Sequence, residues 1–148
     1  MNSRFAIAVH ILTVIAHEGG EPVTSEYIAS SVNTNPSLIR RLISQLTRAG
    51  LTTSQMGTGG GALLAKPAAS VTLCDVYLAV ADGAIFGLHR EQPNPECPVG
   101  RNIQALLTGR FGEATRALED DLARTTIADV LYEVAERGKR RGRRRMVG

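Results

Sequence analysis

The sequence contains no tryptophan, and aromatic residues make up only 4% of it. A hydrophobic core must therefore come mainly from Leu, Ile, Val and Ala, which dominate the 43% of hydrophobic residues. This composition favours helices over a β-sandwich, because β-strands are enriched in aromatic residues. A chain of 148 residues has room for one domain, or for a small domain with an appended helical arm. We therefore predict a mostly α-helical fold.

Further absences exclude whole classes of protein. No run reaches the roughly 20 apolar residues of a membrane-spanning helix, and polar residues interrupt the N-terminal segment where a signal peptide would be uniformly apolar. The two cysteines, Cys74 and Cys97, are too few for a disulfide scaffold at this length. We therefore expect a cytoplasmic protein with no membrane partner.

Acidic residues are missing from residues 27–74, a segment that carries Arg40, Arg41, Arg48 and Lys66. The net charge of +3 conceals this uneven layout, because residues 137–145 alone hold seven Lys and Arg residues. Without residues 137–148, the remainder has ten basic and fourteen acidic groups, a net charge of −4. A local cationic segment on an acidic body is what a confined DNA-binding face needs.

The N-terminal third has the pattern of three helices. Apolar spacing predicts the first over residues 3–17 and a short second helix over 25–32, which Thr24 is expected to cap. Asn35 as a cap and Pro36 at the first helical position begin the third, which extends to about residue 49. Two helices joined by so short a turn form a helix-turn-helix. The residues of the third helix expected to face inward are Leu38, Leu42 and Leu46.

A glycine-rich turn follows the helix-turn-helix. The β-prone segments 51–56 and 62–65 flank the glycines of residues 57–61, which predicts a β-hairpin, or wing. Thr72 then caps a fourth helix that is expected to end near Asp82. Residues 1–82 are therefore predicted to form a winged helix-turn-helix DNA-binding domain.

The C-terminal part is predicted to consist of a sensor-type loop over residues 83–98, a dimerisation helix and a packing helix within residues 99–136, and a disordered basic tail over 137–148. Apolar residues recur every three or four positions along the long helix, and such a seam is expected to pack on a second copy of the chain. The tail either strengthens nonspecific DNA binding through counterion release or is a solvated end. The predicted dimer interface comprises Ile103, Leu107, Phe111, Ala114, Leu118 and Leu122.

Several short motifs add to this order of elements: residues 35–42, Leu46, and residues 49–51, 57–67, 71–76 and 94–101. Through their order and spacing the chain resembles the Rrf2 family of bacterial transcription regulators, which includes the iron–sulfur cluster regulator, the nitric-oxide-sensing repressor and the cysteine-metabolism repressor. The resemblance covers nearly the whole chain except the basic tail. It implies a homodimeric winged-helix repressor that binds double-stranded DNA.

Polar residues of the helix-turn-helix and of the wing are the predicted DNA contacts. Arg40 and Arg41 are expected near base edges, because an arginine can bind guanine through two hydrogen bonds. Arg48 and Lys66 are expected at phosphates, which position the protein without specifying sequence. Family members often carry an arginine at the wing tip, where this chain has Met56. The wing is therefore expected either to approach only the DNA backbone or to be a structural hairpin with no role in DNA binding. The predicted set is Thr24, Ser25, Asn35, Ser37, Arg40, Arg41, Ser44, Arg48, Met56, Gly57, Thr58, Gly59, Gly60 and Lys66.

The cysteine loop determines what such a regulator senses. Relatives that bind a cluster have three cysteines in this loop, or cysteines with His or carboxylate ligands, whereas this chain has only Cys97 there. One thiol with His89 nearby falls short of the roughly four ligands of an iron–sulfur cluster, and the spacing matches no zinc site. The chain thus resembles the members that lack a cluster, and we expect no cofactor and no metal.

Cys97 itself admits two interpretations. It precedes Pro98 at the expected start of the long helix, with Arg101 one turn further on, and both features favour a reactive thiolate. Cys97 is therefore either a redox or electrophile switch or an unreactive loop cysteine. The signal, a small molecule or an oxidant, is left open.

Two other classes of function compete with a DNA-binding regulator. A winged-helix module that binds only proteins would present an acidic or apolar third helix, whereas this one carries Arg40 and Arg41. A thiol enzyme would need a base and an orienting group for Cys97, and His89 is the only nearby candidate for the base. We therefore predict a sequence-specific, homodimeric transcriptional repressor and not an enzyme.

Overall fold

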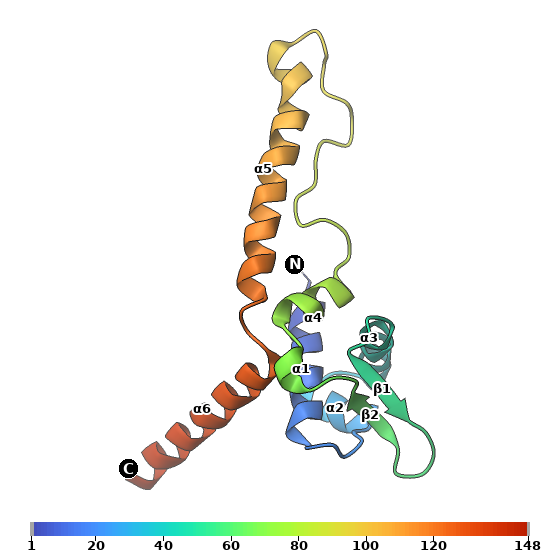
Figure 1. Ribbon diagram of the computed structural model, residues 1–148, viewed down its shortest axis with the longest axis vertical. Coiled ribbons are helices and arrows are strands. Elements are labelled where there is room, and N and C mark those ends of the chain that lie inside the picture. The colour runs from blue at the N-terminus through green and yellow to red at the C-terminus, as the bar shows by residue number, and fades with distance from the viewer. Residues whose placement is uncertain (1, 148) are drawn as a thin grey trace.

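A computed structural model describes residues 2–147, and Figure 1 shows its arrangement. The described chain is mostly helical, with one two-stranded antiparallel sheet, which confirms the predicted fold class. None of its helices is long and apolar enough to cross a membrane. In chain order the elements are α1 (Arg4–His17), α2 (Ser25–Val32), α3 (Pro36–Arg48), β1 (Thr52–Gln55), β2 (Gly61–Leu64), the 3-10 helix η1 (Ala68–Ser70), α4 (Leu73–Val80), α5 (Pro98–Leu122) and α6 (Ile127–Val147).

The hydrophobic core forms around α1, which contacts α2, α3, α4, α6 and β2. Its buried hydrophobic residues are all Ala, Ile, Leu or Val, as the lack of aromatic residues predicted. Ile11 and Leu12 from α1, Leu46 from α3 and Val76 from α4 are among those completely shielded from solvent. The same core includes Ile127 from α6, so the C-terminal helix is anchored on the N-terminal domain.

Local capping interactions define where the helices begin. The Thr24 hydroxyl accepts a hydrogen bond from the Tyr27 backbone N–H at 3.1 Å, which caps α2. At α4, Thr72 and Asp75 each accept a hydrogen bond from the other's backbone N–H, at 3.1 and 3.0 Å. Such reciprocal caps satisfy backbone donors that have no partner within the helix. The structure therefore confirms the two predicted helix starts.

The wing is a short hairpin that is joined to the helix-turn-helix at its base. Its strands pair in register from Thr52 opposite Leu64 to Gln55 opposite Gly61. Two backbone hydrogen bonds, of 3.0 and 2.8 Å, also link Ala62 to Val23, just before α2. A Cβ atom on Gly61 would lie 2.5 Å from the Val23 carbonyl oxygen, so only glycine allows this close approach.

The long helix α5 extends away from the body, with the loop after α4 running beside it (Figure 1). None of its residues is buried. The ring of Phe111 on α5 stacks on Phe86 of the loop, with ring centroids 4.9 Å apart. Helix α4 ends at Val80, slightly earlier than the predicted end near Asp82.

Helix α6 differs from the sequence prediction. A helix ending near residue 136 and a disordered basic tail were expected, but α6 continues to Val147. Arg and Lys are good helix formers, and their positive charge interacts favourably with the C-terminal end of a helix. The Lys139 ammonium also lies 3.3 Å from the Glu136 carboxylate, one turn earlier. Gly148 lies outside the described residues.

Candidate nucleic-acid interface

Helix α3 is held in place by its apolar face and presents a polar face to solvent. The Asn35 side chain accepts a hydrogen bond from the Leu38 backbone N–H at 2.9 Å, and this cap orients the first turn. Leu42 and Leu46 are buried as predicted. Leu38 is only half-buried, and the residues that complete the buried face are Ile39 and Ile43, because the apolar stripe of a helix is wider than one row of residues spaced four apart.

A groove of about 540 Å³ lies between α3 and the wing. One wall carries Arg40, Ser44 and Arg48 from α3, and the other includes Met56 at the end of the first wing strand. Ser25 from α2 also lines it. Five of the predicted DNA-contacting residues therefore meet around one hollow, although they come from three separate segments.

A second hollow, of about 460 Å³, lies on the other flank of α3. It brings Arg41 and Arg48 together with Arg4 from α1. The Arg4 guanidinium donates a hydrogen bond to the Gln45 side chain at 2.7 Å and lies 3.6 Å from the Asp82 carboxylate. Sequence reasoning missed Arg4, because no local pattern relates it to a helix more than thirty residues further along the chain.

The remaining predicted contacts occupy different positions. The side chains of Thr24 and Asn35 are exposed, but their oxygens already cap helices. Ser37 is exposed in the first turn of α3, and residues 57–60 form the tip of the wing, where Thr58 is exposed. Lys66 is exposed beyond the end of β2, at the base of the hairpin, and is not among the residues that line the two hollows.

One acidic residue modifies the charge of this face. The Arg40 guanidinium lies 3.2 Å from the carboxylate of Glu26 on α2, the residue immediately before the acid-free segment. Arg48 donates a weaker hydrogen bond, 3.4 Å long, to the Ser44 hydroxyl. Arg40 is thus partly neutralised by an acid in the free chain, whereas Arg41 has no salt bridge to any residue among 2–147.

The predicted dimer seam is only partly covered in the single chain. Ile103, Leu107, Phe111 and Leu122 are half-buried, and Ala114 is exposed. Leu118 retains 40% of its accessible surface. Apolar surface that stays exposed is costly to leave in water.

The two cysteines lie in different environments. Cys97 is exposed at the position that precedes α5, where the backbone N–H groups of Gly100 and then Val99 lower the pKa of its thiol. Cys74 is half-buried on α4, and burial, followed by the negative charge of Glu119, raises the pKa of its thiol. Exposure and a lowered thiol pKa both favour a thiolate at Cys97 rather than at Cys74.

A helix-turn-helix with an arginine-bearing third helix and a wing defines this chain as a winged helix-turn-helix transcriptional regulator. The family model Rrf2, described as "Iron-dependent Transcriptional regulator", matches residues 1–133. The chain belongs to the Rrf2 family, whose members are transcriptional regulators and not enzymes. It is 45% identical over 132 residues to YwnA of Bacillus subtilis, named as an HTH-type transcriptional regulator, with 88% of this chain and 96% of YwnA covered.

Solved structures show the same fold. A protein crystallised as a DNA-binding protein superimposes with a TM-score of 0.71 at 42% identity, covering 87% of this chain and 99% of that one. CymR, described as the global cysteine regulator of B. subtilis, superimposes with a TM-score of 0.66 at 20% identity, covering 90% of this chain and 96% of CymR. Both likenesses extend beyond the N-terminal domain.

The family description mentions iron, and the residues present can be tested against an iron site. Among the described residues, no three His, Cys, Asp or Glu side chains come together as potential metal ligands. Cys97 is the only thiol in the loop, and Cys74 is half-buried on a different helix. An iron–sulfur cluster is usually held by about four ligands, so the donor set of one chain does not fit one.

Proposed function

We propose that this regulator is a homodimeric repressor that binds operator DNA through α3 and the wing. The observation that carries the proposal is the exposed face of α3, where Arg40, Arg41 and Arg48 border two hollows beside a glycine-rich wing. Arginines at the edge of a helix can enter the major groove and bind guanine through two hydrogen bonds. Because the protein is proposed to act on DNA, we also propose that it is located in the cytoplasm.

The roles of the arginines are assigned from their positions. Arg40 and Arg41 project from the first half of α3 and are proposed to contact bases, and Arg48, in its last turn, is proposed to contact phosphate. Lys66 is proposed to contact phosphate from the base of the wing. The wing tip, with Met56 in place of an arginine, is proposed to approach the backbone, where the amides of glycines can donate to phosphate oxygens.

Selection of bound fragments from genomic DNA by the purified protein tests the proposal. We expect a preferred sequence with approximate two-fold symmetry, as a dimer requires. Arg41→Gln should lower the affinity for that sequence by roughly 10- to 100-fold, the worth of one good bidentate contact. Arg124→Gln, at an exposed arginine beyond α5, is the matched control and should change little.

The alternative, a winged-helix module that binds only proteins, predicts the opposite outcome. In that case no sequence would be enriched, and Arg41→Gln would leave the weak residual DNA binding unchanged. Either result would refute the assignment of α3 as a recognition helix.

Dimerisation is proposed to occur through the seam on α5. A second copy would cover Leu107, Phe111 and Leu118 together with the rest of the seam, and so remove their apolar surface from water. Light scattering should give about twice the chain mass of 15.8 kDa. Leu118→Glu should shift the protein towards the monomer, because it places a charge in an apolar interface; an unchanged mass would assign the dimer to another surface.

A thiol switch at Cys97 is a second candidate function, favoured by its exposure and its lowered thiol pKa. A thiol of lowered pKa is more readily oxidised or alkylated. Oxidant should then release the wild-type protein from the selected DNA but leave Cys97→Ser bound. Equal release of both proteins would show that Cys97 is not the switch.

A further inference from the structure

A dense group of cations occupies the second half of α6. Residues 137–145 hold seven Lys and Arg residues and no acidic residue, and all seven side chains are exposed. Among the described residues, Lys139 is the only one of the seven with a salt bridge, to Glu136. The other six, called the arginine set below, are Arg137, Arg140, Arg141, Arg143, Arg144 and Arg145.

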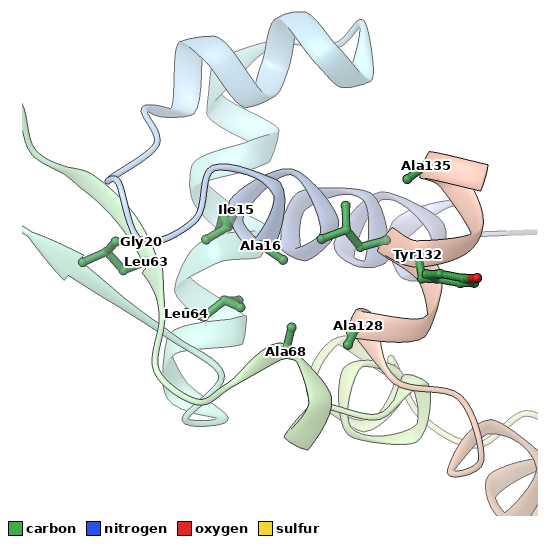
Figure 2. A pocket seen from close by; sticks show the side chains of 10 residues that line it. Ile15, Ala16, Gly20, Leu63, Leu64, Ala68, Ala128, Tyr132 and Ala135 are labelled. Atoms are coloured by element: carbon green, nitrogen blue, oxygen red, sulfur yellow. The ribbon is translucent and has the colours of Figure 1, made fainter. Parts of the chain in front are cut away.

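The first half of α6 fixes the direction of this cationic segment. Ile127 is completely buried, and its backbone N–H donates a hydrogen bond to the Val71 carbonyl at 2.9 Å. Figure 2 shows Ala128 and Ala135 of α6 around the cleft that Ile15 and Leu64 also line. Because α6 packs on α1 and η1 of the winged-helix domain, its continuation moves with that domain.

The arginine set projects beyond the body. The last α6 residues that line the clefts shared with α1 are Val134 and Ala135, so the cations begin where these contacts end. Figure 1 shows that α6 leaves the body on the side away from α3 and the wing. The second half of α6, which carries the arginine set, therefore lies apart from α3, which carries Arg40 and Arg41.

The spacing of these charges favours a polyanion. Arg137 and Arg141, like Arg140 and Arg144, are four residues apart, a spacing at which like charges on a helix repel. Residues 137–145 span about 12 Å at a rise of 1.5 Å per residue, and duplex DNA carries about one negative charge per 1.7 Å of its axis. A duplex laid against α6 therefore offers several phosphates to the arginine set at once.

We propose that the arginine set of α6 is a second, sequence-independent DNA site, which holds phosphates outside the segment bound by α3. This inference rests on the proposed function, because it takes duplex DNA as the partner. The acidic residues of α5 on a second copy are a poorer match. Glu113 already lies 3.9 Å from Arg110, and Glu119, Asp120 and Asp121 offer only three charges within a single turn of the helix.

The salt dependence of binding to a random-sequence 30-base-pair duplex tests the inference. The variant replaces all six residues of the arginine set by Gln in the full-length chain, and the matched control replaces them by Lys, which keeps the charge. A duplex can touch one side of the helix, about three of the six. Each lost phosphate contact should reduce the salt slope by about 0.9, so the Gln variant should lose about 2.7 from the slope.

This expectation corresponds to a measurable difference in affinity. Between 50 and 200 mM KCl, the wild type and the Lys variant should weaken roughly 40-fold more than the Gln variant. Equal slopes for the wild type and the Gln variant would overturn the inference, as would equal losses in the Gln and Lys variants.

Two parallel measurements distinguish other partners. Stronger binding of the wild type to phosphatidylglycerol–phosphatidylcholine vesicles than to the duplex at the same salt would assign the arginine set to a membrane surface. A lower molar mass of the Gln variant with an unchanged slope would assign it to a second copy of the chain. Both results would overturn the DNA assignment. A different result would refute the proposed function itself, namely an unchanged affinity of Arg41→Gln for the selected fragment.

Discussion

The contact between Glu26 and Arg40 leads to a prediction that is unusual for a conservative substitution, namely that Glu26→Gln strengthens DNA binding. The two groups are 3.2 Å apart on the face proposed to meet DNA. In the complex the Glu26 carboxylate competes with the DNA for the guanidinium of Arg40. The negative charge of Glu26 also repels the DNA phosphates. Replacement by the neutral amide of similar size removes both effects.

The size of the effect follows from the exposure of the pair. The Arg40 and Glu26 side chains retain 56% and 69% of their accessible surface, and exposed ion pairs of this kind contribute about 0.2–1 kcal/mol. Releasing Arg40 from this competition should therefore raise the affinity for the selected fragment roughly 1.5- to 5-fold. Glu26 also lies in the first turn of α2, so the free protein should lose up to about 1 kcal/mol of stability.

Fluorescence anisotropy with the selected fragment at 100 mM KCl measures the affinity of Glu26→Gln, Arg40→Gln and the double variant. The gain from Glu26→Gln should shrink in the Arg40→Gln background, because the pair no longer exists there. Glu21→Gln is the matched control, since Glu21 is exposed and forms no salt bridge within residues 2–147. An unchanged or weaker affinity of Glu26→Gln, or an equal gain in both backgrounds, would refute the reasoning.

Three further substitutions or measurements probe the core, the wing and the cysteines. Leu46→Ala removes a fully buried side chain and should cost about 2–5 kcal/mol in urea unfolding; a loss under 1 kcal/mol would contradict its place in the core. Gly61→Ala should lower the free energy of unfolding by about 1–3 kcal/mol, because the new Cβ would lie 2.5 Å from a carbonyl oxygen. Gly109→Ala on α5, where the new Cβ meets open space, should raise it by up to about 1 kcal/mol. A change of the same sign in both variants would refute this account. The alkylation rate of Cys97 should rise at a lower pH than that of free cysteine, because backbone N–H groups stabilise its thiolate and lower its pKa. Cys74, whose thiol pKa is raised, should be alkylated only at higher pH. Mass spectrometry that found the reverse order would be inconsistent with the structure.

The sequence predicted best those features that depend on residues a few positions apart. The caps at Thr24, Asn35 and Thr72 each bond to a backbone N–H three residues later, so the pattern alone reveals them. The glycine-rich hairpin is equally local. By contrast, the helical state of residues 137–147 was missed, because a run of like charges favours disorder and the anchor at Ile127 was not apparent.

The amino-acid sequence by itself determined the order of the elements, a core without aromatic residues, and the cationic character of α3, because periodicity, caps and composition act over short distances. Only the tertiary structure decided which charges meet. It set Glu26 beside Arg40, and Arg4 on the flank of α3 that Arg41 shares. It also tied the wing to Val23 through Ala62. These contacts join segments far apart in the chain, and they exist only because packing around α1 brings those segments to one face.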